Sequence, residues 1–364
     1  MGSDVGGNAM DRREKAFLEA VGDGFVKEPI AAGAIKEKLL LEKIACSYVS
    51  KLPRKRKEKA LFDQTLYQIF FHPEVPLYAI LDESQKLAKK YIHPSFAKFL
   101  NGAFRSISSR QIPFFNDFSI QYSLPPFFIE KVIQERGKEE ALDVFQAFRA
   151  PPRLFARKGK EIMELSGTGT DLGDDLYIQN ITPIHLFFDL GEACKSVPKR
   201  VLDMAAAPGG KLLLASECFP EAKLFGNDVS EKKLDLIREN LERLGKKATL
   251  SCSLGEDLQF DELFDLVIAD VPCSNTGVLH KRAEARWRLS QEEIDAAAEK
   301  QRRLVKKGLE LLKPDGVLFY MTCSILKEEN DQVVAEYHPL FQRTILPDQN
   351  GFDGGFAALL QKTR

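Results

Sequence analysis

Short apolar segments alternate with helical segments from Arg200 onward, and this alternation constrains the fold more than any other feature of the sequence. Predicted strands cover residues 200–204, 223–227, 263–269 and 317–321, and predicted helices cover residues 211–218, 231–244 and 291–312. Such an order gives a parallel sheet with helices on both faces. Ligands of these sheets bind at the carboxyl ends of the strands. We therefore expect the functional residues directly after the strands.

The first third of the chain shows helical periodicity only. Apolar residues recur every three or four positions over residues 30–50, 61–71 and 77–91, and a further helix is predicted over 95–107. A helical pair broken at Gly137 follows over 127–149, and then a polar stretch with several glycines over 158–175. The predicted fold class is therefore α/β, a Rossmann-like core preceded by an all-α domain.

Four segments follow from these patterns. Residues 1–10 are polar and rich in glycine, and we expect a disordered tail or a tag there. The all-α domain covers residues 11–120, an intermediate segment covers 121–195, and the α/β domain covers 196–364. No uninterrupted apolar run approaches the roughly 20 residues that cross a bilayer, and no secretory signal is seen, so we expect a cytoplasmic protein without a membrane partner.

Cysteine usage and charge argue against other classes of protein. The six cysteines are scattered without a CxxC pair, and the five histidines show no metal-ligand spacing relative to them, so we expect neither a disulfide framework nor a metal. The formal net charge is −1, and the overall charge therefore does not indicate nucleic acid. Residues 54–59 are locally basic, for which a solvated loop between helices is the simpler interpretation.

A turn of small residues joins the first strand of the α/β region to its helix. The candidate cofactor-binding residues of this turn are Asp203, Ala205, Ala206, Ala207, Pro208, Gly209, Gly210 and Lys211. Small residues let a ligand approach the backbone, and the start of the helix offers unpaired N–H groups. Asp228 closes the next strand, where a carboxylate can accept both ribose hydroxyls of a nucleoside. The turn alone would be a generic nucleotide-binding turn, but together with Asp228 it predicts a nucleoside cofactor.

Two cysteines stand directly after strands, on the side of this turn. Cys273 follows the strand 263–269, and Cys323 follows the strand 317–321. A single cysteine is usually a small buried apolar residue, an interpretation that we adopt for Cys46, Cys194, Cys218 and Cys252. Two thiols at equivalent positions beside a nucleoside turn indicate catalysis instead.

A thiol suits methyl transfer to carbon 5 of cytosine. That carbon is a poor nucleophile, and the addition of a thiolate to carbon 6 moves electron density onto it. Asp270 is placed to protonate N3 or to hydrogen-bond with it as charge builds on the ring. Lys211 would lower the pKa of a nearby thiol. The residue pattern alone does not rank Cys273 and Cys323, because either thiol could add to the ring.

Over roughly residues 120–364 the chain resembles the NOP2/Sun family of RNA (cytosine-5)-methyltransferases. The matching elements are residues 203–211, Asp228, and residues 270–274, 322–324, 328–330 and 353–359. The resemblance implies S-adenosylmethionine as the cofactor, bound by residues 203–211, Asp228 and Asp270. It also implies Cys323 as the nucleophile and Cys273 as the thiol that assists release of the product. Asp270 and Lys211 would contact the cytosine.

The N-terminal helices resemble the NusB-like RNA-binding domain, notably over residues 67–76, 79–91 and 101–105. Together the two resemblances imply an enzyme that acts on small-subunit (16S) ribosomal RNA, with 121–195 as a segment that contacts RNA, and we expect a monomer. The chain departs from the family at Leu254, where an acid usually faces the adenine. Its segment 151–177 is also shorter than the corresponding segment of the family.

A basic loop that contains the only tryptophan of the chain follows Cys273. Lys281, Arg282, Arg286 and Trp287 combine positive charge with an aromatic ring, which suits phosphate contacts and base stacking. The alternative is a solvated loop with a half-buried tryptophan. Because the loop follows a predicted cytosine site, we predict that these four residues contact RNA.

Two other functions remain open on the residues alone. A methyltransferase of proteins or small molecules would explain the turn but would leave both strand-end cysteines without a role. A non-catalytic RNA-binding or ribosome-assembly factor would fit Leu254 and the short middle segment, but it would not need Cys273 and Cys323.

Overall fold

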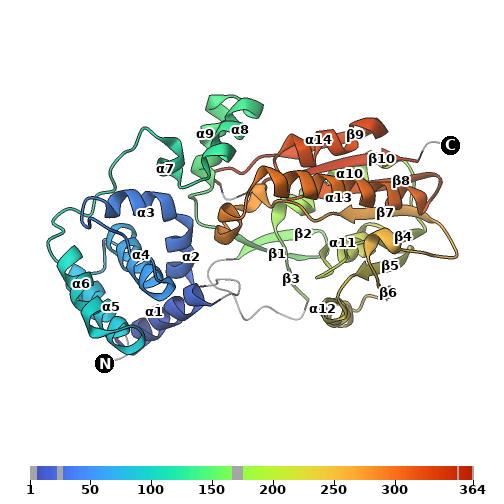
Figure 1. The fold of residues 1–364 in the computed structure, drawn as a ribbon. Helices are drawn as coiled ribbons and strands as arrows, with labels where there is room; N and C mark the ends of the chain where they lie inside the picture. The colour runs from blue at the N-terminus through green and yellow to red at the C-terminus, as the bar shows by residue number, and fades with distance from the viewer. Residues whose placement is uncertain (1–5, 23–27, 166–174, 351, 363–364) are drawn as a thin grey trace. The chain divides into compact units, whose positions relative to one another are not determined.

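The computed structural model describes residues 6–22, 28–165, 175–350 and 352–362, and the chain divides into two compact units (Figure 1). The first unit holds the residues up to 134 together with 282–288, a short segment from far along the chain. The second unit holds residues 135–281 and those from 289 onward. The domain boundaries at 120 and 195 stay predictions. No helix of the described residues is long and apolar enough to cross a membrane.

The first unit is helical. Its helices are α1 (Gly6–Val21), α2 (Pro29–Lys36), α3 (Lys38–Ala45), α4 (Arg56–Phe71), α5 (Leu77–Tyr91), α6 (Pro94–Phe104), α7 (Phe118–Tyr122) and most of α8 (Pro126–Arg136). The buried residues of α5 have the spacing of one helical face and are Ile80, Leu81, Ser84, Leu87 and Ala88. Such faces close a core in which the rings of Phe62 and Phe104 pack with their centroids 5.0 Å apart.

The predicted helices of this unit are present, with a difference at one place. The helix expected over 30–50 is two helices, because the chain turns at Glu37 (φ −94°, ψ 22°) between α2 and α3. Helix α1 begins at Gly6, and the expectation of a disordered tail or a tag over residues 1–10 stays a prediction. Residues 1–5 lie outside the described residues.

The second unit is built on a seven-stranded sheet. Its strands are β4 (Arg200–Asp203), β5 (Lys223–Asp228), β6 (Thr249–Cys252), β7 (Phe264–Asp270), β8 (Leu312–Thr322), β9 (Phe341–Ile345) and β10 (Gly355–Gln361). The order is β6-β5-β4-β7-β8-β10-β9. The first five strands in this order are parallel, whereas β10 is antiparallel to both of its neighbours. The chain order reverses at β4, so the carboxyl end of β4 is the expected ligand site.

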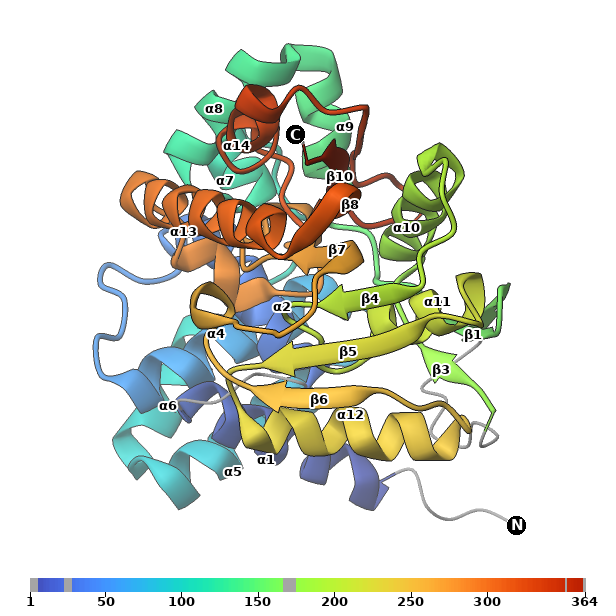
Figure 2. The same cartoon turned by 90° about the vertical axis from the view of Figure 1, so that its right-hand side faces the viewer.

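Helices cover both faces of this sheet (Figure 2). On one face α10 (Ile181–Ala193), α11 (Gly210–Cys218) and α12 (Glu231–Arg243) share a core with Leu266 and Phe319. On the other face α13 (Gln291–Glu310) and α14 (Asp331–Val334) share a core with Val267 and Leu318. Consecutive residues within β7, and likewise within β8, are thus buried on opposite faces of the sheet. Burial on both faces explains why these strands have continuous runs of apolar residues. The remaining helices of this unit are α9 (Lys138–Ala147), η1 (Gly255–Asp257), η2 (Thr276–Val278), η4 (Lys327–Glu329) and η5 (Ala335–Tyr337), whereas η3 (Ala283–Trp287) lies in the segment 282–288 of the first unit.

A three-stranded antiparallel sheet precedes the large one. Its order is β2-β1-β3, with β1 (Leu154–Lys158), β2 (Glu161–Leu165) and β3 (Tyr177–Ile178). The sequence analysis assigned no strand to the polar stretch 158–175 and therefore missed β2. Its glutamates occupy exposed positions of the strand, and they conceal the strand pattern in the sequence. Residues 166–174 lie outside the described residues.

Candidate active site

The carboxyl ends of the parallel strands bring together the residues that the sequence singled out. Asp203, Asp228 and Asp270 are the last residues of β4, β5 and β7, and Cys323 directly follows β8. Cys273 comes shortly after the end of β7. Parallel strands end at one edge of a sheet, and these five residues therefore lie along that edge.

The turn between β4 and α11 folds tightly back on the sheet. Gly209 precedes α11 in a left-handed conformation (φ 110°), which favours glycine. Its N–H donates to the Ala206 carbonyl oxygen at 2.6 Å, and the Ala206 N–H donates to the Asn227 carbonyl oxygen of β5 at 2.7 Å. The Ala205 N–H donates to Asp203 Oδ1 at 3.2 Å. The turn is thus fixed to the ends of both strands, and the first N–H groups of α11 are left without partners inside the helix.

The small sheet supports this turn from the side. Arg157 of β1 is 1% exposed, and its guanidinium donates to Gln179 Oε1 at 2.9 Å and to the Gly210 carbonyl oxygen at 3.4 Å. A Cβ on Gly210 would lie 3.0 Å from Gln179 Nε2, so only glycine permits this approach without a shift. The Tyr177 hydroxyl donates to the Pro208 carbonyl oxygen at 3.3 Å. Sequence reasoning missed Arg157 and Gln179, because no motif marks them.

A cavity of about 270 Å³ opens beside the turn. The predicted site residues that line it are Ala205, Ala206, Ala207, Pro208, Gly210, Lys211 and Asp270. Asp203, Gly209, Asp228 and the two cysteines are not among its lining residues. Five further residues from β3 and the start of α10 were missed by the sequence analysis, namely Tyr177, Ile178, Gln179, Asn180 and Pro183. The cavity is therefore shared between the turn and a segment that carries no recognisable motif.

The neighbouring strand ends suit an adenosine. Asp228, 6% exposed, offers a carboxylate to ribose hydroxyls. Val229, which follows β5, and Leu254, which follows β6, are each 58% exposed. Exposed apolar side chains on two neighbouring strand ends supply the contacts that a purine ring makes in its pocket. Leu254 thus replaces a polar contact with an apolar one, and the residues present still fit the nucleoside of S-adenosylmethionine.

Lys211 and Asp270 form an ion pair at the cavity. Burial is the largest single effect on Lys211 and lowers its pKa, but the neighbouring acidic groups, first Asp270 and then Asp203, together raise the pKa above that of a free lysine, so Lys211 keeps its charge. Asp203 behaves differently, because burial, and next the charge of Asp270, raise its pKa to about 7. The positive charge of Lys211 is therefore paired with a carboxylate in this structure.

The two cysteines lie in contact, with their Sγ atoms 3.1 Å apart. The Cys323 S–H donates to Asn275 Oδ1 at 3.3 Å, and Asn275 Nδ2 donates to the Cys273 carbonyl oxygen at 3.0 Å. The hydrogen bond with Cys323 and then burial raise the pKa of Cys273 well above that of a free thiol. The expected lowering of a thiol pKa by Lys211 is therefore wrong for Cys273. Sequence reasoning missed Asn275, although its place directly after Cys273-Ser274 could have drawn attention to it.

Two of the four predicted RNA contacts lie where they can meet a ligand. Lys281 belongs to the second unit, where its ammonium lies 2.9 Å from Asp353 Oδ1 and donates to Asn180 Oδ1 at 2.7 Å. Asn180 lines the cavity, so Lys281 stands next to it. The side chain of Arg282 is 52% exposed. Both residues stay predictions as RNA contacts.

Arg286 and Trp287 have a structural role in the first unit. Arg286 is 0% exposed, and its guanidinium donates to the carbonyl oxygens of Lys36 at 3.3 Å and Ser123 at 3.2 Å. Trp287 Nε1 donates to the Ile35 carbonyl oxygen at 2.7 Å. These carbonyls stand at the ends of α2 and α7, where helices leave acceptors unpaired. The prediction that Arg286 contacts RNA is wrong, because its charge is buried among backbone acceptors, and we no longer assign Trp287 to RNA.

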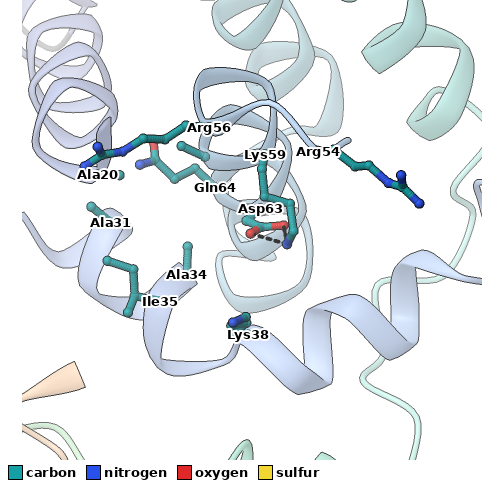
Figure 3. A pocket seen from close by; sticks show the side chains of 11 residues that line it. Ala20, Ala31, Ala34, Ile35, Lys38, Arg54, Arg56, Lys59, Asp63 and Gln64 are labelled. Carbon is teal, nitrogen blue, oxygen red and sulfur yellow. Dashed lines mark hydrogen bonds and ion pairs between the residues drawn. The ribbon is translucent and has the colours of Figure 1, made fainter. Parts of the chain in front are cut away.

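Residues 54–59 border two cavities of the first unit. The first, of about 270 Å³, is lined by Ala20, Ala31, Ala34, Ile35, Lys38, Arg54, Arg56, Lys59, Ala60, Asp63 and Gln64. The Lys59 ammonium donates to Asp63 Oδ1 at 2.6 Å. Figure 3 shows this pair with Arg54 and Arg56 on either side. The second, of about 470 Å³, is lined by Lys51, Leu52, Pro53, Arg54, Lys55, Glu58, His93, Ser95, Phe96 and Phe99. The interpretation as a solvated loop is wrong for residues 56–59, because they form the first turn of α4.

Comparisons with known proteins agree with this geometry. Residues 196–339 match the family model described as 16S rRNA methyltransferase RsmB/F, and residues 8–109 match the NusB family. The ribosomal RNA small subunit methyltransferase B of Klebsiella pneumoniae (strain 342) is 27% identical over 306 residues, which cover 75% of this chain and 71% of that protein. The protein of the same name from Shewanella oneidensis is 26% identical over 363 residues, with 85% and 84% covered.

Solved structures share the fold. The crystal structure of PH0851 has a TM-score of 0.79 with 20% identity and covers 96% of this chain and 98% of that chain. A methyltransferase homolog protein from Pyrococcus horikoshii has a TM-score of 0.57 with 23% identity and covers 68% of this chain and 98% of that chain. The first of these covers nearly the whole chain, so the combination of a helical region with the α/β core also occurs in a solved protein.

The turn for a nucleoside lies where the parallel sheet reverses its strand order. The domain that contains this turn matches a methyltransferase family model. This chain is therefore an S-adenosylmethionine-dependent methyltransferase. The predicted fold class, enzyme class and cofactor are thereby confirmed. Within that class, residues 196–339 form a methyltransferase domain that matches the RsmB/F family model, and residues 8–109 before it match the NusB family model. No group of three or more metal-binding side chains that could hold a metal ion is found in the part of the chain that the structure describes.

Proposed function

We propose that this methyltransferase is a cytoplasmic monomer that methylates carbon 5 of a cytosine in small-subunit ribosomal RNA. The main support is the pair of Sγ atoms of Cys273 and Cys323, 3.1 Å apart beyond the neighbouring strands β7 and β8. Methylation of a nitrogen needs no thiol, whereas carbon 5 becomes reactive only after addition at carbon 6. The curated relatives that the chain resembles are named for ribosomal RNA.

Cys323 is the proposed nucleophile. Its thiolate sulfur forms a bond to carbon 6, and the electron pair of the C5–C6 double bond becomes available at carbon 5. The turn 203–211 and Asp228 would hold S-adenosylmethionine, which would supply a methyl group to carbon 5, with the bond from the methyl group to the positively charged sulfur breaking to leave a neutral thioether. A base then removes the proton from carbon 5, the double bond re-forms, and the Cys323 thiolate leaves. Cys273 keeps its proton because its pKa is raised by the hydrogen bond with Cys323 and by burial, so it can donate that hydrogen bond to the leaving sulfur.

Lys211 and Asp270 are the proposed cytosine contacts. Both line the cavity beside the turn, and they form an ion pair there. A carboxyl group that carries a proton can donate to N3 and accept from the exocyclic amine of cytosine, and an ammonium can donate to the ring carbonyl. These contacts stabilise the charge that builds on the ring after the sulfur adds.

Basic and aromatic side chains of the first unit are the proposed contacts of the RNA backbone. Arg54 and Arg56 border the cavity of Figure 3, and Arg54 also borders the second cavity together with Phe99. Positive charges near an aromatic ring suit single-stranded RNA, in which phosphates and unstacked bases are both accessible. In this proposal they take the place of Arg286 and Trp287, while Lys281 and Arg282 are kept as contacts.

Incubation with radiolabelled S-adenosylmethionine and unmodified small-subunit ribosomal RNA, followed by mapping of 5-methylcytosine, tests the function. Cys323→Ala is expected to abolish transfer. Cys273→Ala is expected to leave a protein–RNA adduct that survives denaturant, because release of the sulfur is slowed. Cys46→Ala, an exposed thiol of the first unit, is the matched control and should keep full activity. Normal methylation by Cys323→Ala, or a label on nitrogen, would contradict the proposal.

A further inference from the structure

Each active-site cysteine is followed by a serine, and both serines bond to one buried carboxylate. The Ser274 N–H donates to Glu329 Oε1 at 2.7 Å, and the Ser274 hydroxyl donates to Glu329 Oε2. The Ser324 hydroxyl donates to the same Oε2 at 2.5 Å. Glu329 is 0% exposed. One side chain therefore connects the residue after Cys273 with the residue after Cys323.

The core behind the sheet edge holds Glu329 in place. Gln301 of α13 donates its side-chain amide to Glu329 Oε1 at 3.2 Å and to the Pro272 carbonyl oxygen at 2.9 Å. The Tyr320 hydroxyl of β8 donates to the Glu329 carbonyl oxygen at 2.6 Å. These bonds engage the backbone and the carboxylate together. A buried polar group with so many partners has one defined position.

The donors to the carboxylate are neutral groups, namely the N–H and hydroxyl of Ser274, the hydroxyl of Ser324 and the amide of Gln301. Burial of a carboxylate among neutral groups costs free energy, which hydrogen bonds offset only when their geometry is good. A link needed only for packing would cost less with apolar side chains. The carboxylate therefore indicates that the positions of the two loops themselves matter.

We propose that Glu329 is a positioning residue that sets the separation of the Cys273 and Cys323 sulfur atoms. It acts through Ser274 and Ser324, each one peptide bond from a cysteine. This inference rests on the proposed covalent function and extends it to the support of the two thiols. A misplacement of about 1 Å in an active site can cost roughly 100-fold in rate, so a loosened loop would be felt directly in catalysis.

Glu329→Gln is the informative substitution because it preserves shape. A carboxylate accepts hydrogen bonds on both oxygens, whereas the amide of glutamine accepts on one side and donates on the other. If the new amide turned its NH2 group toward the Ser274 N–H and the Gln301 side chain, hydrogen-bond donors would face donors and no bond would form. Turned the other way, it would meet two hydroxyls that now donate to one oxygen. The first orientation breaks the link, and the second keeps it only if both serine hydroxyls turn to accept, which replaces charge-assisted hydrogen bonds by weaker neutral ones.

Oxidation of the thiols measures their separation without RNA or cofactor. The oxidant diamide takes two electrons and two protons from Cys273 and Cys323 and becomes the hydrazine, and a disulfide forms between the sulfurs. Peptide mass spectrometry after alkylation gives the rate. Glu329→Gln is expected to slow this step by about tenfold or more, since the effective concentration of one thiol near the other falls. Ser216→Ala, which removes a buried hydroxyl on α11, is the matched control.

Activity supplies the second readout. Glu329→Gln is expected to lower kcat by roughly 10- to 100-fold, to change the KM values by less than about twofold, and to accumulate the protein–RNA adduct. The pair of substitutions Ser274→Ala and Ser324→Ala should act in the same direction, and adding Glu329→Gln to them should cost little more. If Glu329→Gln does not fold, this pair replaces it in both assays.

Wild-type rates of disulfide formation in Glu329→Gln, or equal slowing in Ser216→Ala, would overturn the positioning role. Failure of the proposed function looks different. The wild-type protein would then make no 5-methylcytosine, while Glu329→Gln would still slow disulfide formation.

Discussion

Asp203 and Asp270 end neighbouring strands but have different surroundings, and they therefore have different chemical roles. Asp270 is paired with Lys211 at the cavity, where a substrate ring can reach both. Asp203 is 1% exposed and does not line that cavity, and burial followed by the charge of Asp270 raises its pKa to about 7. At neutral pH Asp203 is thus close to its midpoint of ionisation in the folded protein, although a free aspartate is fully charged.

The raised pKa of Asp203 predicts a pH-dependent stability. The folded state keeps the proton on Asp203 at pH values where the unfolded chain has lost it, so the contribution of this residue falls as pH rises toward about 7. Asp203→Asn removes that dependence. We expect the Tm of Asp203→Asn minus the Tm of wild type, measured without ligands, to increase by at least roughly 3 °C between about pH 5 and about pH 8, because only the wild type loses stability as Asp203 ionises.

Asp261→Asn, at an exposed position after β6, controls for the loss of a charge and should show the same Tm difference at both pH values. An equal Tm difference for Asp203→Asn at the two pH values would show that its proton is not held more tightly in the folded state.

At the scale of elements, segment 282–288 has the function of a helix cap. Arg286 donates to carbonyl oxygens at the ends of α2 and α7, and Trp287 donates to the end of α2. The ammonium of Lys38 lies 5.1 Å from the centre of the Trp287 ring, which adds a favourable cation–π contact. A segment that looks like an RNA-binding loop in the sequence thus completes the hydrogen bonding of another element.

Arg286→Ala is expected to destabilise the helical unit by about 2–4 kcal/mol, because buried carbonyl oxygens lose a charged donor and a cavity is left. Trp287 is the only tryptophan of the chain, so its fluorescence during urea unfolding reports on this unit. Arg288→Ala removes an exposed arginine, 3.8 Å from Glu284, and should change stability by less than about 0.5 kcal/mol. Weaker RNA binding by Arg286→Ala at unchanged stability would instead restore its role as an RNA contact.

The sequence predicted the elements that are determined by patterns within their own residues. Strand β7 and helix α5 were predicted with ends within one residue, because continuous apolar residues and regular apolar spacing act within a single element. Strand β2 was missed because glutamates occupy its exposed positions, and its partner strand β1 lies across a turn. The turn at Glu37 between α2 and α3 depends on the residues that these helices pack against, and the local sequence does not show them.

The candidate site shows the same division. Cys273, Cys323 and Asp270 could be found because strand ends are visible in the sequence and parallel strands end together. Arg157 and Gln179 could not, because they reach the turn from a different sheet through long-range contacts. Glu329 was seen only as part of a matching element, since its bonds to Ser274 and Ser324 connect three loops.

At the scale of the whole molecule, charge is nearly balanced, with 52 basic and 53 acidic residues. Long-range attraction by net charge therefore cannot account for affinity toward a polyanion. Local clusters must supply it, and five basic residues of the segment 51–59 line the two cavities of the helical unit, namely Lys51, Arg54, Lys55, Arg56 and Lys59.

The double variant Arg54→Gln/Arg56→Gln is expected to raise the KM for RNA by about 5- to 20-fold and to leave kcat unchanged, because phosphate contacts position the RNA without entering the reaction. The slope of log affinity against log salt should decrease in magnitude by about 1 to 2. Filter binding over a salt series and steady-state kinetics measure both. Lys195→Gln/Lys199→Gln, exposed at the amino end of β4, is the charge-matched control. Equal effects of the two double variants would exclude a local RNA site.

The return of residues 282–288 to the helical unit means that this protein cannot be divided by a single cut. A fragment that starts after α8 would present Trp287 and Arg286 to water without their acceptors, and the complementary fragment would leave the last carbonyls of α2 bare. A hybrid that exchanges the helical part between relatives therefore needs three junctions, so that the short returning segment travels with the helices that it caps.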